Sequence, residues 1–162
     1  MSERLWRVYL SGEIHTNWRE QIAEGVAAAG LPLRLDAPIT VHEDSDDCGA
    51  VILGEEDKPF WRDQKGSRMN AIRTRTLIGE ADVVVVRFGE KYRQWNAAFD
   101  AGTAAALGKA LITLHDPGLT HALKEVDGAA LAVCETPQQV VQTLAYVIRG
   151  ELPGRSGSLA AE

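Results

Sequence analysis

The stretch Asp82-Val83-Val84-Val85-Val86 decides the fold class of this chain. Four consecutive β-branched residues favour a strand. Because valine occupies both alternating faces of that strand, both faces must be covered, which is typical of a parallel sheet with helices on each side. We therefore predict that residues 83–86 form a central strand of such a sheet.

Segments that favour strand and helix alternate on both sides of this strand. The predicted strands lie at residues 8–10, 31–35, 110–114 and 129–133, and the predicted helices at 16–29, 65–79, 94–107 and 137–149. The first helix has apolar residues at helical spacing and ends at Gly30, a residue that commonly closes helices. This order predicts an α/β fold: a doubly wound, flavodoxin-like parallel sheet of about five strands with helices on both faces.

The length and composition indicate one soluble domain. The chain has 162 residues, of which 45% are hydrophobic and 25% charged, so it can bury a core without disulfides or metals. We expect a single domain over residues 1–150 and a flexible Gly/Ser/Ala-rich tail over 151–162. Residues 36–64, which are acidic and contain prolines, are predicted to be a long connection.

The charge and the remaining patterns exclude several classes of protein. With 17 Lys+Arg against 23 Asp+Glu, the net charge is −6, which argues against a general nucleic-acid binder. No apolar run reaches the ~18 residues of a membrane span, and no secretory signal is recognisable. The two cysteines make no metal motif, and we interpret the acidic run 43–47 as a solvated loop. We expect a cytoplasmic protein without metal, cofactor, membrane or nucleic acid.

In a doubly wound sheet, ligands bind at the carboxyl ends of the strands. Three segments follow predicted strands: Ser11–Arg19, Arg87–Asp100 and His115–Gly118. We expect these segments to converge on one pocket at the same edge of the sheet.

The first segment has the features of an anion-binding turn. Gly12 permits a close backbone approach, Thr16 can cap the helix, and the free N–H groups of the helix start, with His15 and Arg19, suit a phosphate or carboxylate. The alternative is a plain capped turn with solvated side chains.

The second segment combines aromatic residues with one carboxylate. Tyr92, Trp95 and Phe99 could stack on a planar base. Asp100 lies among small residues in a predicted helix, where it is either a nucleophile or base or a structural hydrogen-bond acceptor.

Three stretches carry a family resemblance: residues 9–12 (Tyr-Leu-Ser-Gly), 87–96 (Arg-Phe-Gly-Glu-Lys-Tyr-Arg-Gln-Trp-Asn) and 99–104 (Phe-Asp-Ala-Gly-Thr-Ala). Over residues 7–115 the chain resembles the nucleoside 2-deoxyribosyltransferase superfamily, and within it the YtoQ-type family. In that superfamily a glutamate attacks the anomeric carbon of the sugar, and its position falls on Asp100. Two aspartates of the transferases fall on Thr74 and Gln94. The resemblance also implies a homodimer or larger homo-oligomer.

The leading hypothesis is an N-glycosidase or N-glycosyltransferase that acts on a nucleoside, nucleotide or related N-riboside. Asp100 would be the nucleophile, and Glu13 or Glu90 the acid/base, since these are the nearest replacement carboxylates. The expected substrate-binding residues are Ser11, Gly12, His15, Arg19, Arg87, Gly89, Tyr92, Trp95 and Asn96. The alternatives are a non-catalytic nucleotide-binding or signalling module that keeps the pocket, and an oligomeric protein without a small ligand.

Overall fold

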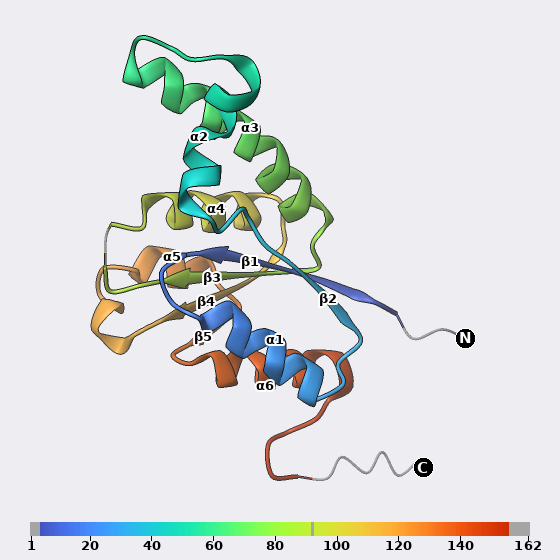
Figure 1. The fold of residues 1–162 in the computed structure, drawn as a ribbon. Helices are drawn as coiled ribbons and strands as arrows, with labels where there is room; N and C mark the ends of the chain where they lie inside the picture. The colour runs from blue at the N-terminus through green and yellow to red at the C-terminus, as the bar shows by residue number, and fades with distance from the viewer. Residues whose placement is uncertain (1–3, 92, 156–162) are drawn as a thin grey trace.

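The protein, described by a computed structural model over residues 4–91 and 93–155, is built around a five-stranded parallel sheet (Figure 1). The strands occur in the spatial order β2-β1-β3-β4-β5 and all neighbouring pairs are parallel. Their bounds are β1 Trp6–Gly12, β2 Leu33–Asp36, β3 Val83–Phe88, β4 Ala110–His115 and β5 Ala132–Cys134. The predicted doubly wound, flavodoxin-like fold is confirmed.

Helices cover both faces of the sheet (Figure 1). Helices α1 (Trp18–Ala28) and α6 (Pro137–Arg149) lie on one face, and α3 (Pro59–Glu80), α4 (Trp95–Ala106) and α5 (Lys124–Ala129) lie on the other. In β3, Val83 and Val85 pack into the first core, and Val84 and Val86 into the second. This division explains why valine occupies every position of the stretch.

The strand order reverses between β1 and β3, and the two backbones approach closely at Gly12. Gly12 pairs with Arg87 across the two strands and has a φ of +116°. A Cβ at Gly12 would lie 2.1 Å from the carbonyl oxygen of Arg87. The carboxyl ends of β1 and β3 therefore meet at a position that only glycine can occupy, which is the switch point where ligands of this fold bind.

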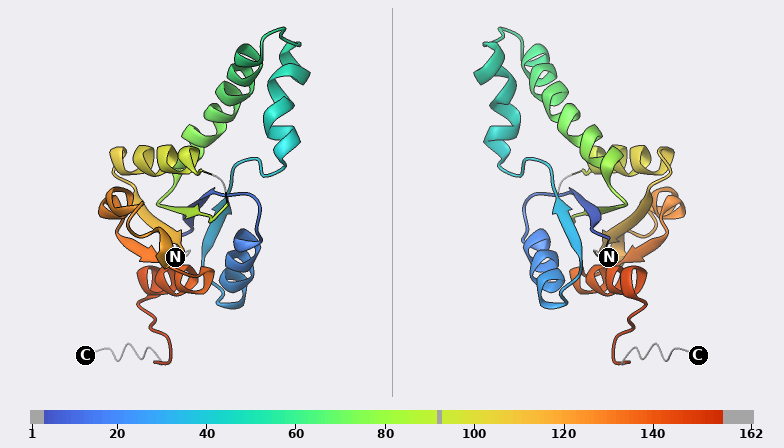
Figure 2. Two further views of the ribbon diagram at one scale, coloured as in Figure 1. Left: turned by 90° about the vertical axis from the view of Figure 1, so that its left-hand side faces the viewer. Right: turned by 90° about the vertical axis from the view of Figure 1, so that its right-hand side faces the viewer.

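The prediction of a long connection over residues 36–64 is wrong. Helix α2 (His42–Leu53) occupies part of it, and α3 begins at Pro59, six residues before the predicted start at 65. The two helices form a hairpin that projects from the body of the molecule (Figure 2). Gly49 permits this packing, because a Cβ there would lie 2.5 Å from the backbone nitrogen of Gly66.

The other predicted elements are present with boundaries that differ by three residues or fewer. Helix α6 covers 137–149 as predicted, whereas the last strand covers 132–134 rather than 129–133. Residue 129 instead ends α5, a short helix that was not predicted. No helix in the described part of the chain is long and apolar enough to cross a membrane.

Candidate active site

The site is built by β1 and α4 at the carboxyl edge of the sheet. Tyr9 packs on the α4 side of the sheet, and because side chains alternate along a strand, Ser11 lies on the same side. Asp100 lies in the second turn of α4, and the hydroxyl of Ser11 donates a hydrogen bond of 2.6 Å to its Oδ2. The structure thus brings together two of the predicted site residues from segments 89 residues apart in the sequence.

Burial of Asp100 makes the ionised form of its carboxyl less stable than it is in water. Burial raises the pKa of Asp100, and the hydrogen bond from Ser11 only partly opposes this. No other carboxylate of the described residues contributes to the pKa of Asp100. The site therefore holds one isolated, partly desolvated carboxylate.

Tyr9 is a further candidate for the site, which the sequence analysis named only as part of the stretch 9–12. Its side chain is fully buried, and its hydroxyl lies beside the side chain of Thr74. Burial raises the pKa of Tyr9 to about 12; the negative charge of Asp100 acts in the same direction, while the neighbouring Thr74 and two arginines oppose it. The available signal was its position two residues before Ser11, which places both side chains on one face of β1.

Glu13, one of the two predicted acid/base residues, turns back onto its own loop. Its Oε2 accepts hydrogen bonds from the backbone nitrogens of His15 (2.7 Å) and Thr16 (3.1 Å), and its Oε1 accepts one from the Thr16 hydroxyl. Burial alone would raise the pKa of Glu13, but these hydrogen bonds and the charge of Arg87 lower it overall. A buried carboxylate that stays ionised is a poor proton donor at neutral pH.

Arg19 organises the same loop instead of facing open solvent. Its guanidinium donates to the carbonyl oxygens of Leu10 (3.1 Å), Gly12 (3.1 Å) and Glu13 (2.7 Å). The prediction that Thr16 caps the helix is wrong: Asn17 is the N-cap residue, and no side chain caps the helix. Thr16 instead donates its hydroxyl to Glu13.

The segment after β3 presents two aromatic side chains at the surface. Trp95 is 70% exposed and Phe99 is 67% exposed, so both are available to a ligand rather than part of the core. Glu90 and Asn96 are also exposed. Tyr92, the third member of the predicted stacking wall, lies outside the described residues.

In the third predicted segment, His115–Gly118, the histidine makes its contacts with α5. The side chain of His115 is buried, with Nε2 2.9 Å from Oδ2 of Asp127 and Nδ1 2.8 Å from the carbonyl oxygen of Asp116. Thr113 donates to the same Asp127 carboxylate at 2.8 Å. His115 therefore links β4 to α5, and both of its ring nitrogens are engaged in these contacts.

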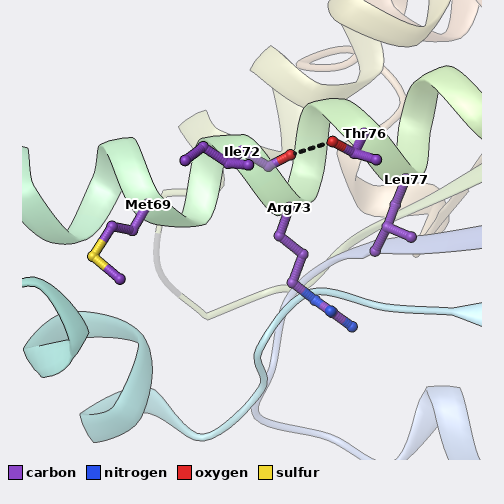
Figure 3. Close-up of a pocket in the computed structure, with 5 residues that line it drawn as sticks. All are labelled: Met69, Ile72, Arg73, Thr76 and Leu77. Carbon is purple, nitrogen blue, oxygen red and sulfur yellow. Dashed lines mark hydrogen bonds between the residues drawn. The ribbon is translucent and has the colours of Figure 1, made fainter. Parts of the chain in front are cut away.

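Asp100 lines neither of two hollows on the surface of the protein. One, of about 340 Å³, is lined by residues of α3, among them Arg73 (Figure 3). The guanidinium of Arg73 donates a hydrogen bond of 3.0 Å to the carbonyl oxygen of Ala37. The other, of about 250 Å³, lies beside the ends of β1 and β2 and is lined in part by Leu10, Arg19 and Asp36. Within the described residues no group of three or more His, Cys, Asp and Glu could hold a metal ion.

Comparisons with known proteins agree with this architecture. Residues 9–148 match the family described as nucleoside 2-deoxyribosyltransferase YtoQ. The chain is 42% identical over 144 residues to the uncharacterized protein YtoQ of Bacillus subtilis (strain 168), covering 89% of this chain and 97% of that one. Its fold is similar to that of a 2-deoxyribosyltransferase from Bacillus psychrosaccharolyticus, with a TM-score of 0.51, 14% identity, and coverage of 85% of this chain and 95% of the other.

Proposed function

Because the chain belongs to the family described as nucleoside 2-deoxyribosyltransferase YtoQ, we propose that it cleaves or transfers the N-glycosidic bond of a nucleoside or a related N-riboside. Asp100 is the nucleophile of this reaction. The observation that carries the proposal is the 2.6 Å hydrogen bond from Ser11 to Asp100, at the edge of the sheet where this fold binds its ligands.

The reaction follows from the position of the two carboxylate oxygens. Ser11 holds Oδ2, which leaves Oδ1 of the ionised Asp100 to attack the anomeric carbon of the sugar. The carbon–nitrogen bond breaks, its electron pair leaves with the base, and the base takes a proton from solvent. Water or a second base then attacks the anomeric carbon, releases the carboxylate, and gives hydrolysis or transfer respectively.

The surroundings of Asp100 suit this role. Partial burial removes water from the carboxylate, so its ionised form is less stabilised and more reactive. The exposed rings of Trp95 and Phe99 offer stacking surfaces to the base.

A second candidate is a nucleotide-binding module that does not turn its ligand over. It is favoured by the isolation of Asp100, whose pKa no other described carboxylate perturbs, and by the engagement of Glu13 within its own loop. Such a protein would be stabilised by nucleosides or nucleotides and would release no base.

The test is the release of free base from a mixture of ribonucleosides and 2-deoxyribonucleosides. The wild-type protein should release base, and Asp100→Asn should reduce the rate by at least ~10³-fold, as removal of a catalytic nucleophile does. Asp63→Asn makes the same chemical change at an exposed position of α3 and should leave the rate unchanged. Base release that persists in a folded Asp100→Asn variant would refute the assignment of Asp100.

A further inference from the structure

The hairpin of α2 and α3 carries apolar and charged side chains on a surface that the rest of the chain does not cover. In the described part of the chain α2 packs mainly on α3, and the hairpin projects from the body of the molecule (Figure 2). We propose that the hairpin is the docking surface for a second copy of the chain, in which the acidic α2 of each copy packs on the basic α3 of the other. This inference is independent of the proposed function.

Large apolar side chains of both helices are exposed. On α2, Val51 is 79% exposed and its neighbour Ile52 is also exposed. On α3, Ile72 is 71% exposed, and the exposed Trp61 lies eleven residues before it, which is three helical turns and places both on one face. Burying such side chains against a partner stabilises the complex, and exposed apolar surface of this kind indicates an interaction site.

The contacts that join α2 to α3 leave this face of α3 free. They are made by Gly49 against Gly66, and by the side-chain amide of Asn70, which donates to the carbonyl oxygen of Ser45 at 2.9 Å. Gly66 and Asn70 are four residues apart and share one face of α3. Ile72 lies about 120° around the helix from Gly66 and about 160° from Asn70. Helix α3 therefore presents one face to α2 and a different one to solvent.

The opposite charges of the two helices favour a second copy as the occupant. Helix α2 has four acidic residues and no lysine or arginine, and α3 has five basic residues against two acidic ones. Some of these charges pair within the hairpin, as Arg62 does with Asp47 at 2.6 Å. Asp44, Arg68 and Arg75 are exposed and make no ion pair among the described residues. A surface with an acidic half and a basic half complements itself when a two-fold axis places each half on the other.

The positions of these charges along the hairpin agree with such a pairing. Gly49 and Gly66 mark the point where the two helices meet. Counted from that point toward the body of the molecule, Asp44 is five residues away on α2, and Arg68 and Arg75 are two and nine residues away on α3. A two-fold axis along the hairpin keeps every residue at its level. Asp44 of one copy then lies between Arg68 and Arg75 of the other, within ~6 Å of each along the axis.

The apolar side chains meet in the same arrangement. Counted from the same point toward the tip of the hairpin, Ile52 is three residues away on α2 and Trp61 is five residues away on α3. Ile52 of one copy is thus within ~3 Å, along the axis, of Trp61 of the other. The four helices form a bundle in which acidic and basic helices alternate.

The oligomeric state of the full chain, measured by sedimentation equilibrium over a range of concentrations, tests the inference. The wild type should form a species of twice the chain mass. Ile72→Glu should weaken this dimer at least ~10-fold, because it places a charge in the apolar contact. Leu131→Glu changes a similarly exposed residue outside the hairpin and should leave the dimer unchanged. Far-UV circular dichroism reports whether each variant is folded.

Two charge reversals test which helices meet. Asp44→Arg and Arg68→Asp each place like charges opposite one another in a dimer of identical copies, so each should weaken the dimer at least ~10-fold. An equal mixture of the two variants should dimerise again, because every contact between unlike copies then joins opposite charges. Glu24→Arg, at an exposed position of α1, is the matched control and should change nothing.

Three results would overturn the inference. A wild type that stays monomeric at every concentration would show that the hairpin does not dock a second copy. A dimer that Ile72→Glu leaves intact would place the interface elsewhere. A mixture of Asp44→Arg and Arg68→Asp that remains monomeric would show that α2 of one copy does not pack on α3 of the other.

Discussion

Replacing Gly12 with alanine should destabilise the protein by about 4 kcal/mol. Gly12 has a φ of +116°, and an added Cβ would lie 2.1 Å from the carbonyl oxygen and 2.7 Å from the nitrogen of Arg87. The backbone strain costs about 1–3 kcal/mol. The clash also pushes β1 away from β3, which costs a further ~1–3 kcal/mol, as overpacking does. This separation weakens the 3.2 Å hydrogen bond from the Glu13 nitrogen to the Arg87 carbonyl oxygen.

The matched control is Gly30→Ala. Gly30 also has a positive φ, +58°, but an added Cβ there would have no atom within 4 Å, so only the conformational cost of about 1 kcal/mol applies. The free energy of unfolding of both variants is measured by urea denaturation. If Gly12→Ala costs no more than Gly30→Ala, the close approach of β1 to β3 does not constrain the loop, and the reasoning about the site geometry fails.

Three further predictions concern the site. Trp95→Ala should weaken nucleoside binding about ten-fold with little change in Tm, because the ring is 70% exposed and a base stack contributes roughly 1–3 kcal/mol; a large drop in Tm would show that Trp95 is a core residue. The rate of base release should fall as the pH is lowered through the raised pKa of Asp100, because only the ionised carboxylate attacks; a flat rate profile down to the ordinary aspartate pKa of about 3.9 would contradict this. Glu13→Gln should lower stability by about 2 kcal/mol at neutral pH, through weaker hydrogen bonds to the loop. Since the folded-state pKa of Glu13 is depressed, the stability contributed by its carboxylate is complete above the unfolded-state pKa of about 4.3 and is lost as the pH falls through the folded-state pKa. If Glu13→Gln lowers the free energy of unfolding in urea equally at low and neutral pH, Glu13 is not ionised in the folded protein.

The elements that could be predicted from the sequence are those whose pattern reflects burial. The run of valines in β3 and the apolar spacing of α1 and α6 follow directly from the faces that these elements bury. The same reasoning placed Ser11 and Asp100 at one edge of the sheet, since parallel strands and their following helices share that edge.

The hairpin of α2 and α3 could not be found this way, because its helices are joined by close glycine packing and by polar contacts, such as those of Arg62 with Asp47 and of Asn70 with Ser45, which leave no apolar stripe in the sequence. In α2, the buried residues are Gly49 and Ala50. Acidic residues such as Glu43 and Asp44, which were interpreted as a solvated loop, lie in the first turn of α2, where they are favourable to the helix.

The roles of Glu13 and Arg19 depend on local folding that composition does not reveal. Arg19 reaches back to three carbonyl oxygens of the preceding loop, and no pattern in the sequence distinguishes this from a ligand-binding arginine. For Glu13 the sequence did contain a signal, because Thr16 follows it by three residues just before a helix. At this spacing the Glu13 carboxylate can accept hydrogen bonds from the backbone N–H and the hydroxyl of Thr16.

The most direct test of the central claim is the detection of a covalent bond between Asp100 and the sugar. The wild-type protein is mixed with a nucleoside from which it releases base, quenched in acid, digested and analysed by mass spectrometry. We predict that the peptide containing Asp100 carries the mass of one glycosyl group, and that the same peptide from Asp100→Asn does not. Turnover with no adduct on this peptide, or with an adduct on another carboxylate, would contradict the account.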